Sequence, residues 1–384
     1  MEHENNLFVY EKARLELFCF CPSRGGVSEY HVVVHATCPE ESFHTQLEAV
    51  LSAFQRLRRE QMPGAATVFQ RFFLSDAANQ APLVWTQALE DTDGALSVVQ
   101  QPPLDGTKVA LYAYLLTEVT SRVLPCGLYE VAHGAYRHLW AGSMTCRAVR
   151  TEYQTRLLLN DYVMRLASQG CRLADHCLRT WFFVQNVDVN YAGVVKARNE
   201  VFATQELTPD THFIASTGIG GRHADPEITV QMDAYAVAGI RPEQVRQLYA
   251  PAYLNRTYEY GVSFERGTSV DYGDRRQVFI SGTASIDHLG QVVHPGDIRL
   301  QTERMWQNVE ALLQEAECGF DDVAHMLVYL RDVADYAVVR EMFQSRFPQV
   351  PHVLLLAPVC RPGWLIEMEC MAVRPLSSSP FPAF

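Results

Sequence analysis

The sequence predicts an α+β fold of three tandem units, each a β-sheet covered by helices on one side. One order of elements recurs along the chain: a long amphipathic helix, a strand, a second helix and a pair of closing strands. The copies follow one another at a spacing of roughly 110–150 residues, and three copies in the same element order are hard to explain by chance. Of the 384 residues, 48% are apolar, which is enough for several buried cores.

The pattern is clearest near the C-terminal end of the sequence. Residues 277–286 predict a strand, and 299–317 predict a long helix. In that helix Met305, Val309 and Leu312 recur at three- and four-residue spacing, so they share one face. The remaining elements follow in order: a strand at 324–332, a helix at 336–347, and closing strands at 352–358 and 364–373 around a turn at 361–363.

The middle of the chain repeats this order. Residues 153–175 match 300–322, with Gln154–Thr155 opposite Gln301–Thr302. The elements that follow are a strand at 176–188, a helix at 192–205, and closing strands at 212–218 and 228–237.

The N-terminal part carries a degenerate third copy, with a helix at 42–60, a strand at 66–77 and a closing strand at 107–116. We therefore expect units over residues 1–120, 121–250 and 251–384. Together they would form an intramolecular pseudotrimer, with clefts where neighbouring units meet.

Composition and charge exclude several classes of protein. There are 32 Lys and Arg residues against 44 Asp and Glu, so the net charge is −12, and no basic run suggests a nucleic-acid partner. No stretch approaches the roughly 20 apolar residues that span a bilayer, and the N-terminal residues do not resemble a signal peptide. The ten cysteines are scattered without a C-x-x-C pair, which favours free thiols in the cytoplasm.

Common cofactor motifs are missing from the sequence. The thirteen histidines show neither H-E-x-x-H nor cysteine-paired spacing, so we expect no metal. The glycine-rich stretch 216–221 does not fit G-x-G-x-x-G, and there is no Walker loop or G-x-S-x-G elbow. We expect no cofactor.

The three closing strands differ in their chemistry. The last strand combines Arg361 in its turn with Glu367 on the strand. The position that corresponds to Glu367 is Gln231 in the middle copy and Ala110 in the first. Only one of three clefts therefore keeps an arginine with a carboxylate. This is what a fused trimer would look like after two sites became structural.

Glu367 is the candidate acid. Hydrolysis of an enol ether or imine requires protonation and attack by water, and a carboxyl group in a partly apolar cleft can hold the raised pKa of a general acid. Glu369 shares the same strand face, so it is either a supporting group behind Glu367 or, if the register differs by two, the acid itself. A solvent-facing or ion-paired role for Glu367 is the alternative.

The C-terminal copy resembles the YjgF/Rid superfamily. The resemblance rests on FISGTASI at 279–286, the helix from Gln301 to Asn308, and VCRPGWLIEMECMAV at 359–373. Members of that superfamily are homotrimers with clefts between subunits. In them an Arg before the last strand holds a substrate carboxylate and a Glu on the strand handles a proton or water. Arg361 and Glu367 fall on these positions.

Residues 150–375 are similar more narrowly to the chorismatase branch, which fuses chorismate-mutase-like Rid units in one polypeptide. This resemblance rests on YEYGVSFERGTSV at 258–270 and the turn at 294–297. It implies cleavage or rearrangement of the enolpyruvyl ether of chorismate. The sequence departs from the branch at Ala197, where a Tyr is expected beside Arg198, and no Gly-Arg pair follows.

The resemblance implies roles for the other cleft residues. The planar guanidinium of Arg361 suits a carboxylate, and Arg198 and Arg266 would assist from neighbouring elements. Cys360 would line the same cleft, where a cysteine is associated with the type that forms 3-hydroxybenzoate. Ala284 lies in the small-residue stretch 281–285, which offers backbone N–H groups to a substrate.

Three functions stay open at this point. The leading hypothesis is a chorismatase-like enzyme that releases pyruvate from a small carboxylate substrate. The rivals are a Rid-type imine or enamine hydrolase and a protein that binds a small ligand without catalysis. We expect no nucleic-acid or membrane partner, and a monomer or weak dimer, because the chain would supply its own three units.

Overall fold

The computed structural model describes residues 3–23, 25–91 and 94–384, and within them the chain forms three mixed six-stranded sheets. The first sheet has the order β1-β2-β3-β6-β4-β5. Its elements are β1 His3–Tyr10, β2 Ala13–Phe20, β3 Glu29–Ala36, α1 Phe43–Gln61, β4 Ala66–Leu74, α2 Ala77–Asp91, β5 Ala95–Gln100 and β6 Val109–Leu116.

The second sheet has the order β11-β10-β12-β9-β8-β7. Its elements are β7 Thr120–Val123, β8 Tyr129–His133, β9 Tyr136–Met144, α3 Thr151–Ser168, α4 Leu173–His176, β10 Cys177–Val184, α5 Val187–Thr204, β11 Ala215–Gly220 and β12 Val230–Ala238.

The third sheet has the order β13-β14-β15-β18-β16-β17. It begins before the expected boundary at residue 251, because β13 pairs antiparallel with β14. Its elements are β13 Val245–Leu248, β14 Gly267–Asp271, β15 Arg275–Ala284, α6 Ile298–Glu315, β16 Val323–Leu330, α7 Tyr336–Arg346, β17 His352–Leu356 and β18 Ile366–Pro375.

One topology is repeated in all three sheets, so the prediction of three tandem α+β units is confirmed. Each sheet ends in one parallel pair, β4–β5, β10–β11 or β16–β17, while its other strands pair antiparallel. A parallel pair needs a crossover, and α2, α5 and α7 supply it. The first unit keeps this complete pattern although its sequence copy is degenerate.

Side-chain caps fix where α1 and α6 begin. Ser42 accepts a hydrogen bond from the backbone N–H of Thr45 at the start of α1, and Asp297 accepts one from Leu300 at the start of α6. The periodicity located both helices within two residues of their ends. It did not locate α2, whose apolar pattern is interrupted by Pro82.

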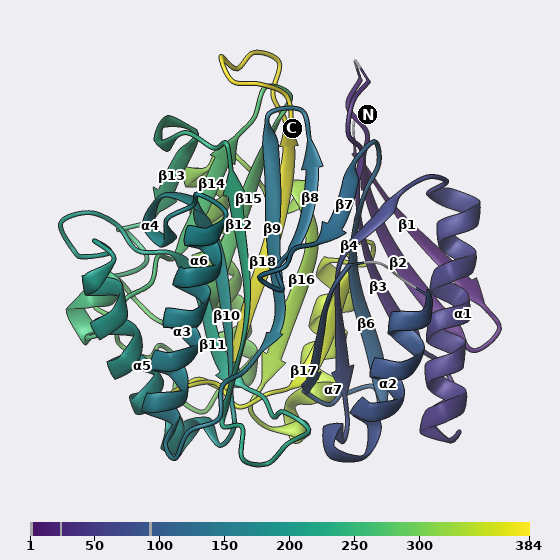
Figure 1. Cartoon of the computed structure of the whole chain (residues 1–384). Helices are drawn as coiled ribbons and strands as arrows, with labels where there is room; N and C mark the ends of the chain where they lie inside the picture. Colours follow the sequence, from purple (N-terminus) through teal and green to yellow (C-terminus); the bar gives the residue numbers. More distant parts are fainter. Residues whose placement is uncertain (1–2, 24, 92–93) are drawn as a thin grey trace.

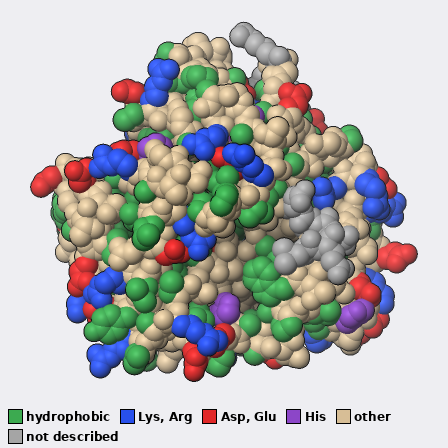
Figure 2. Space-filling model, in the orientation of Figure 1, with side chains coloured by type: hydrophobic (Ala, Val, Ile, Leu, Met, Phe, Trp, Pro, Cys, Tyr) green, Lys and Arg blue, Asp and Glu red, His purple; other side chains and the backbone are tan. Residues whose placement is uncertain are grey.

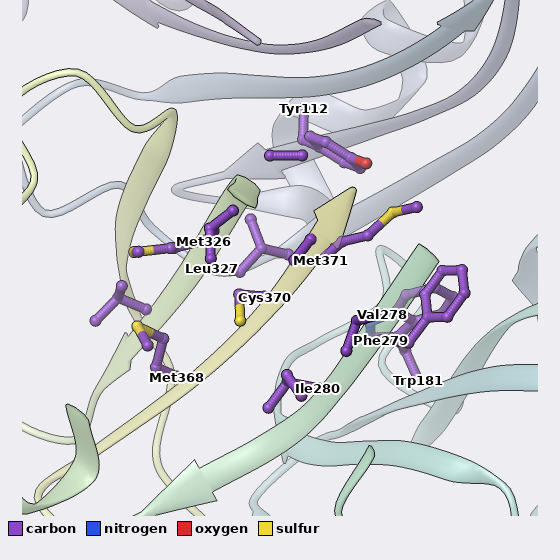
Figure 3. Packing of buried hydrophobic residues seen from close by; sticks show 14 of the residues in the cluster. Tyr112, Trp181, Val278, Phe279, Ile280, Met326, Leu327, Met368, Cys370 and Met371 are labelled. Atoms are coloured by element: carbon purple, nitrogen blue, oxygen red, sulfur yellow. The ribbon is translucent and has the colours of Figure 1, made fainter. Parts of the chain in front are cut away.

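The helices lie on the outer faces of the sheets, and the inner faces of the three sheets pack against one another (Figure 1). The central core contains Tyr112 of β6, Trp181 of β10, Phe279 of β15 and Met371 of β18, from all three units (Figure 3). Strand β18 is buried on both faces from Ile366 to Val373, which explains why its apolar residues do not alternate strictly.

Buried ion pairs join neighbouring units inside this core. Arg71 of β4 donates two hydrogen bonds to Asp233 of β12, at 3.0 and 2.8 Å, and Arg179 of β10 donates one to Glu369 of β18 at 2.6 Å. Loss of one partner from such a pair typically costs about 3–5 kcal/mol. The pairs therefore fix how the sheets are positioned relative to one another.

Acidic and basic side chains are interspersed over the face in Figure 2, without a large patch of one sign. All ten cysteines are free. In the part of the chain that the structure describes, no helix is both long and apolar enough to cross a membrane.

Candidate functional site

A cleft lies where the second unit meets the third. The second unit contributes α5 and β11, and the third contributes the segment 260–266, β15, the 360–364 turn and β18. Together with the open solvent at its mouth, the space between these residues is about 500 Å³.

Glu367 points into this cleft from β18. It is 4% exposed and stands opposite Ala284 of β15 in the sheet register. A β-bulge between Ile280 and Thr283 brings Gly282 under the carboxyl group. A Cβ atom added to Gly282 would lie only 2.8 Å from the carboxyl carbon of Glu367, so the glycine makes room for the acid.

The surroundings of Glu367 favour its protonated form. Burial, and then the charge of Glu369, raise its pKa to about 8, although Arg179 and Arg266 act in the opposite direction. Among the described residues none donates a hydrogen bond to this carboxyl group. At neutral pH the cleft therefore contains a carboxylic acid with a proton to give.

Glu369 does not line the cleft, because its oxygens are already bonded. It accepts hydrogen bonds from Arg179 at 2.6 Å, from the indole N–H of Trp181 at 2.8 Å, and from the hydroxyl of Thr217. All three donors come from the second unit. Glu369 is therefore a fixed negative charge behind Glu367, and its geometry does not suit the acid role.

The middle unit repeats this two-residue pattern without the acid. Asp233 of β12 pairs with Arg71 as Glu369 pairs with Arg179, and two residues earlier Gln231 stands where the third unit has Glu367. The Gln231 amide donates to the carbonyl oxygen of Val98 at 3.2 Å. The side chain at this position of the middle unit is therefore an uncharged amide that is held by a hydrogen bond to the backbone.

Arg198 is the most unusual basic group of the cleft. It projects from α5, is 1% exposed, and has Phe182 and Phe264 each 5.8 Å from its guanidinium carbon. Within the described residues its Nε and Nη2 groups have no hydrogen-bond partner. A buried guanidinium without a partner is costly, so Arg198 is suited to meet an anionic ligand.

Two more arginines line the cleft. Arg266 is buried and donates to the backbone and side-chain oxygens of Asn255 at 3.0–3.2 Å. Arg361 is exposed and lies 4.8 Å from the ring of Tyr260, which also contacts Arg266 at 5.5 Å. The tyrosine ring thus holds both guanidinium groups at the cleft.

Tyr191 belongs to the site, and sequence analysis missed it. Ala197, where a tyrosine was expected, is buried in the helix–sheet core, whereas Tyr191 lines the cleft from the same helix. A Cβ atom added to Gly218 would lie 2.6 Å from the Tyr191 ring, so this glycine admits the ring. The seven-residue spacing to Arg198, two helical turns, was the signal that could have found it.

The hydroxyl and thiol groups of the cleft are neutral. Burial raises the pKa of Tyr191, and burial together with Glu367 raises the pKa of Cys360 to about 12. Cys360 therefore lines the cleft as a thiol and not as a thiolate nucleophile.

The hydroxyls of the small-residue stretch have internal partners. Ser281 donates to the carbonyl of Glu265 at 2.6 Å, and Ser285 donates to that of Val293 at 2.7 Å. Ala284 lines the cleft.

Comparisons with known proteins agree with this architecture. A family model described as endoribonuclease L-PSP matches residues 269–374, the segment that carries Arg361 and Glu367. A RutC family protein of Pyrococcus abyssi is 35% identical over 100 residues, which are 25% of this chain and 78% of that protein. The 3-aminoacrylate deaminase RutC of Acinetobacter baylyi is 30% identical over 97 residues, which are 25% of this chain and 77% of that protein.

A solved structure extends the likeness to most of the chain. The crystal structure of a chorismatase superposes with a TM-score of 0.63 at 20% sequence identity, and covers 80% of this chain and 93% of its own. The two proteins therefore share a fold that includes more than one unit.

Proposed function

Because the chain belongs to the YjgF/Rid superfamily, we propose that it is an enzyme that protonates and hydrolyses a small carboxylate-bearing enol ether, with chorismate as the leading substrate. The observation that carries the proposal is the Glu367 carboxyl group, which is buried in the cleft beside three arginines and has its pKa raised by that burial. The likeness in fold to a chorismatase supports the choice of substrate.

The proposed reaction needs only acid–base steps. Glu367 donates its proton to the methylene carbon of the enolpyruvyl group, and the neighbouring carbon becomes an oxocarbenium ion. Water adds to that carbon and returns a proton to the Glu367 carboxylate. The resulting hemiketal breaks its bond to the ring oxygen, which leaves pyruvate and a hydroxylated ring. We propose no cofactor for these steps.

The arginines account for binding. Chorismate carries two carboxylates, and we assign one to Arg361 at the entrance and the other to the unpaired N–H groups of Arg198. Arg266 and Tyr260 support Arg361. The neutral Tyr191 hydroxyl and the Cys360 thiol lie beside the substrate and contribute to its orientation.

Hydrolysis of an imine or enamine is the second candidate. It is supported by the likeness to the 3-aminoacrylate deaminase RutC, which lies in the segment containing Arg361 and Glu367. The same proton donor and the same arginine would serve, because an enamine is also protonated on carbon before water attacks.

The test is incubation of the purified protein with chorismate and, separately, with 2-iminopropanoate. Products are followed by liquid chromatography. Pyruvate together with a hydroxylated ring product from chorismate supports the first proposal. Turnover of 2-iminopropanoate alone supports the second. Saturable binding of chorismate without turnover of either compound would leave a protein that only binds a small ligand.

We also propose that the chain acts as a monomer or weak dimer, because its three units already form the clefts that Rid trimers form between subunits. Light scattering at several concentrations measures this. A species near 43.4 kDa is expected, and an obligate trimer of the chain would contradict it.

A further inference from the structure

A second cleft lies where the third unit meets the first. Together with the open solvent at its mouth, the space in it is about 750 Å³. Helix α7 and strands β17 and β3 stand where α5, β11 and β15 stand at the Glu367 cleft. Strand β2 adds Arg14 and Glu16 to the lining, and no described residue of β6 lines this cleft. We name it the His35 cleft, after the buried histidine at its inner end.

Strand register shows that the His35 cleft keeps a titratable group at the equivalent place. In the third sheet Ala284 of β15 pairs with Glu367 of β18. In the first sheet His35 of β3 pairs with Ala110 of β6. In the His35 cleft the ionisable side chain therefore stands on the neighbouring strand, opposite the alanine that occupies the position of Glu367.

The wall supplied by the preceding unit is also similar. Tyr336 lies three residues before the buried Val339 of α7, as Tyr191 lies three residues before the buried Val194 of α5. Both tyrosines line their clefts. The floor of the His35 cleft includes apolar residues of β17, among them Val353.

His35 has a charged neighbour on each side but makes no hydrogen bond with either of them. It is 5% exposed, with Nε2 at 3.7 Å from Glu16 and Nδ1 at 3.7 Å from Asp105, both beyond hydrogen-bond distance. Within the described residues Nε2 has no hydrogen-bond partner. Burial opposes a charge on His35, yet Asp105 and Glu16 raise its pKa to about 8, so the ring is a cation at neutral pH.

The charges around the cleft do not balance. Glu16 and Asp105 are ionised, because partners that include His35 lower the pKa of both against the effect of burial. Arg14 pairs with Glu16 at 2.8 Å, while Arg340 of α7 is exposed and its guanidinium lies 5.5 Å from the Tyr336 ring. No described carboxylate pairs with Arg340. The cations His35, Arg14 and Arg340 therefore exceed the carboxylates Glu16 and Asp105 by one positive charge.

We propose that the His35 cleft is a second ligand site, which takes a small monocarboxylate. The ligand carboxylate contacts Arg340 at the mouth, and an apolar body lies against β17. A single negative charge neutralises the excess, whereas a phosphate dianion would be repelled by Glu16 and Asp105. The proposal is independent of the reaction at Glu367, because the two clefts share no lining residue.

The experiment uses the full chain, labelled in its histidine rings for NMR, and benzoate as the probe. The spectrum of H35N assigns the His35 signals. Benzoate is expected to shift them with saturation. The R340A variant should weaken that binding about tenfold, the loss expected for one charge-assisted hydrogen bond. The R361A variant, which alters only the Glu367 cleft, should leave it unchanged.

A matched control is R299A, which removes an exposed arginine of α6 that lines neither cleft. The proposal is overturned if benzoate leaves the His35 signals unmoved, or if R340A weakens binding no more than R299A does. Tighter binding of inorganic phosphate than of benzoate at this cleft would overturn the assignment to monocarboxylates.

Discussion

Replacing Glu369 by Gln tests how much of the raised pKa of Glu367 is due to its charged neighbour. Burial is the larger cause of the raised pKa and is unchanged, whereas the variant removes the negative charge that adds to it. Arg179 stays positive nearby and favours the ionised form, so the pKa of Glu367 must fall.

The magnitude follows from the strand geometry. Side chains at positions i and i+2 of a strand lie on the same face, about 7 Å from each other. At an effective dielectric constant of about 20, two charges at this separation interact by about 2 kcal/mol. That energy corresponds to a shift of about 1.5 pKa units. From the wild-type value of about 8, the pKa should fall below about 7.

Two assays read this shift. Pyruvate release requires protonated Glu367, so the rate falls as pH rises through its pKa, and E369Q should move this limb to lower pH. Infrared spectroscopy of the protonated carboxyl C=O stretch, with E367Q as the reference, reads the same pKa without a substrate.

The control is D233N, which breaks the equivalent buried pair with Arg71 in the middle unit. Both variants should lose about 3–5 kcal/mol of stability, but only E369Q should move the pH limb. An unchanged pH limb in folded E369Q, or an equal shift in D233N, would refute the electrostatic role of Glu369.

Three further predictions concern the same cleft. The raised pKa of Glu367 stabilises the fold at low pH, and this stability is lost as pH rises from about 4.5 to about 8. E367Q should therefore unfold in urea at higher concentration than the wild type at pH 9 but not at pH 4; equal midpoints at pH 9 would contradict this. R198M should increase the free energy of unfolding by about 1–3 kcal/mol, and so raise Tm, because it removes an unpartnered buried charge. It should also raise KM at least about tenfold, because a substrate carboxylate loses its partner. A lower Tm would show that Arg198 already has a partner. G282A places a methyl group against the Glu367 carboxyl and should lower kcat/KM about 100-fold, whereas G319A, which meets open space, should not; equal activities of the two would contradict the packing argument.

Much of the fold could be predicted from the sequence because its signals are local. The apolar spacing of Met305, Val309 and Leu312 locates α6, and the repeated order of elements gives the three units. The helix α2 was not located, since its pattern is weak and includes Pro82. The first unit is complete because its sheet is paired by backbone hydrogen bonds that do not depend on the decayed side chains.

The candidate site could be predicted only in part. Arg361 and Glu367 follow from the resemblance of the last strand, and the structure brings both to one cleft with Arg198. The bonded state of Glu369 depends on Arg179, which is 190 residues earlier in the chain and belongs to another unit. No local pattern reports such a contact.

The titratable group of the His35 cleft was missed for a related reason. In the closing strand of the first unit, Ala110 stands at the position of the glutamate. The histidine lies on the neighbouring strand, and only the register of β3 with β6 reveals that the two positions face each other.

The most direct test of the proposed function is pyruvate release from chorismate by the wild type, E367Q and D233N, measured at pH 7. We expect release by the wild type and by folded D233N, and a loss of about 100-fold or more in E367Q, the usual effect of removing a general acid. Release by E367Q at the wild-type rate would contradict the role of Glu367, and no release by the wild type at high enzyme concentration would remove chorismate as the substrate.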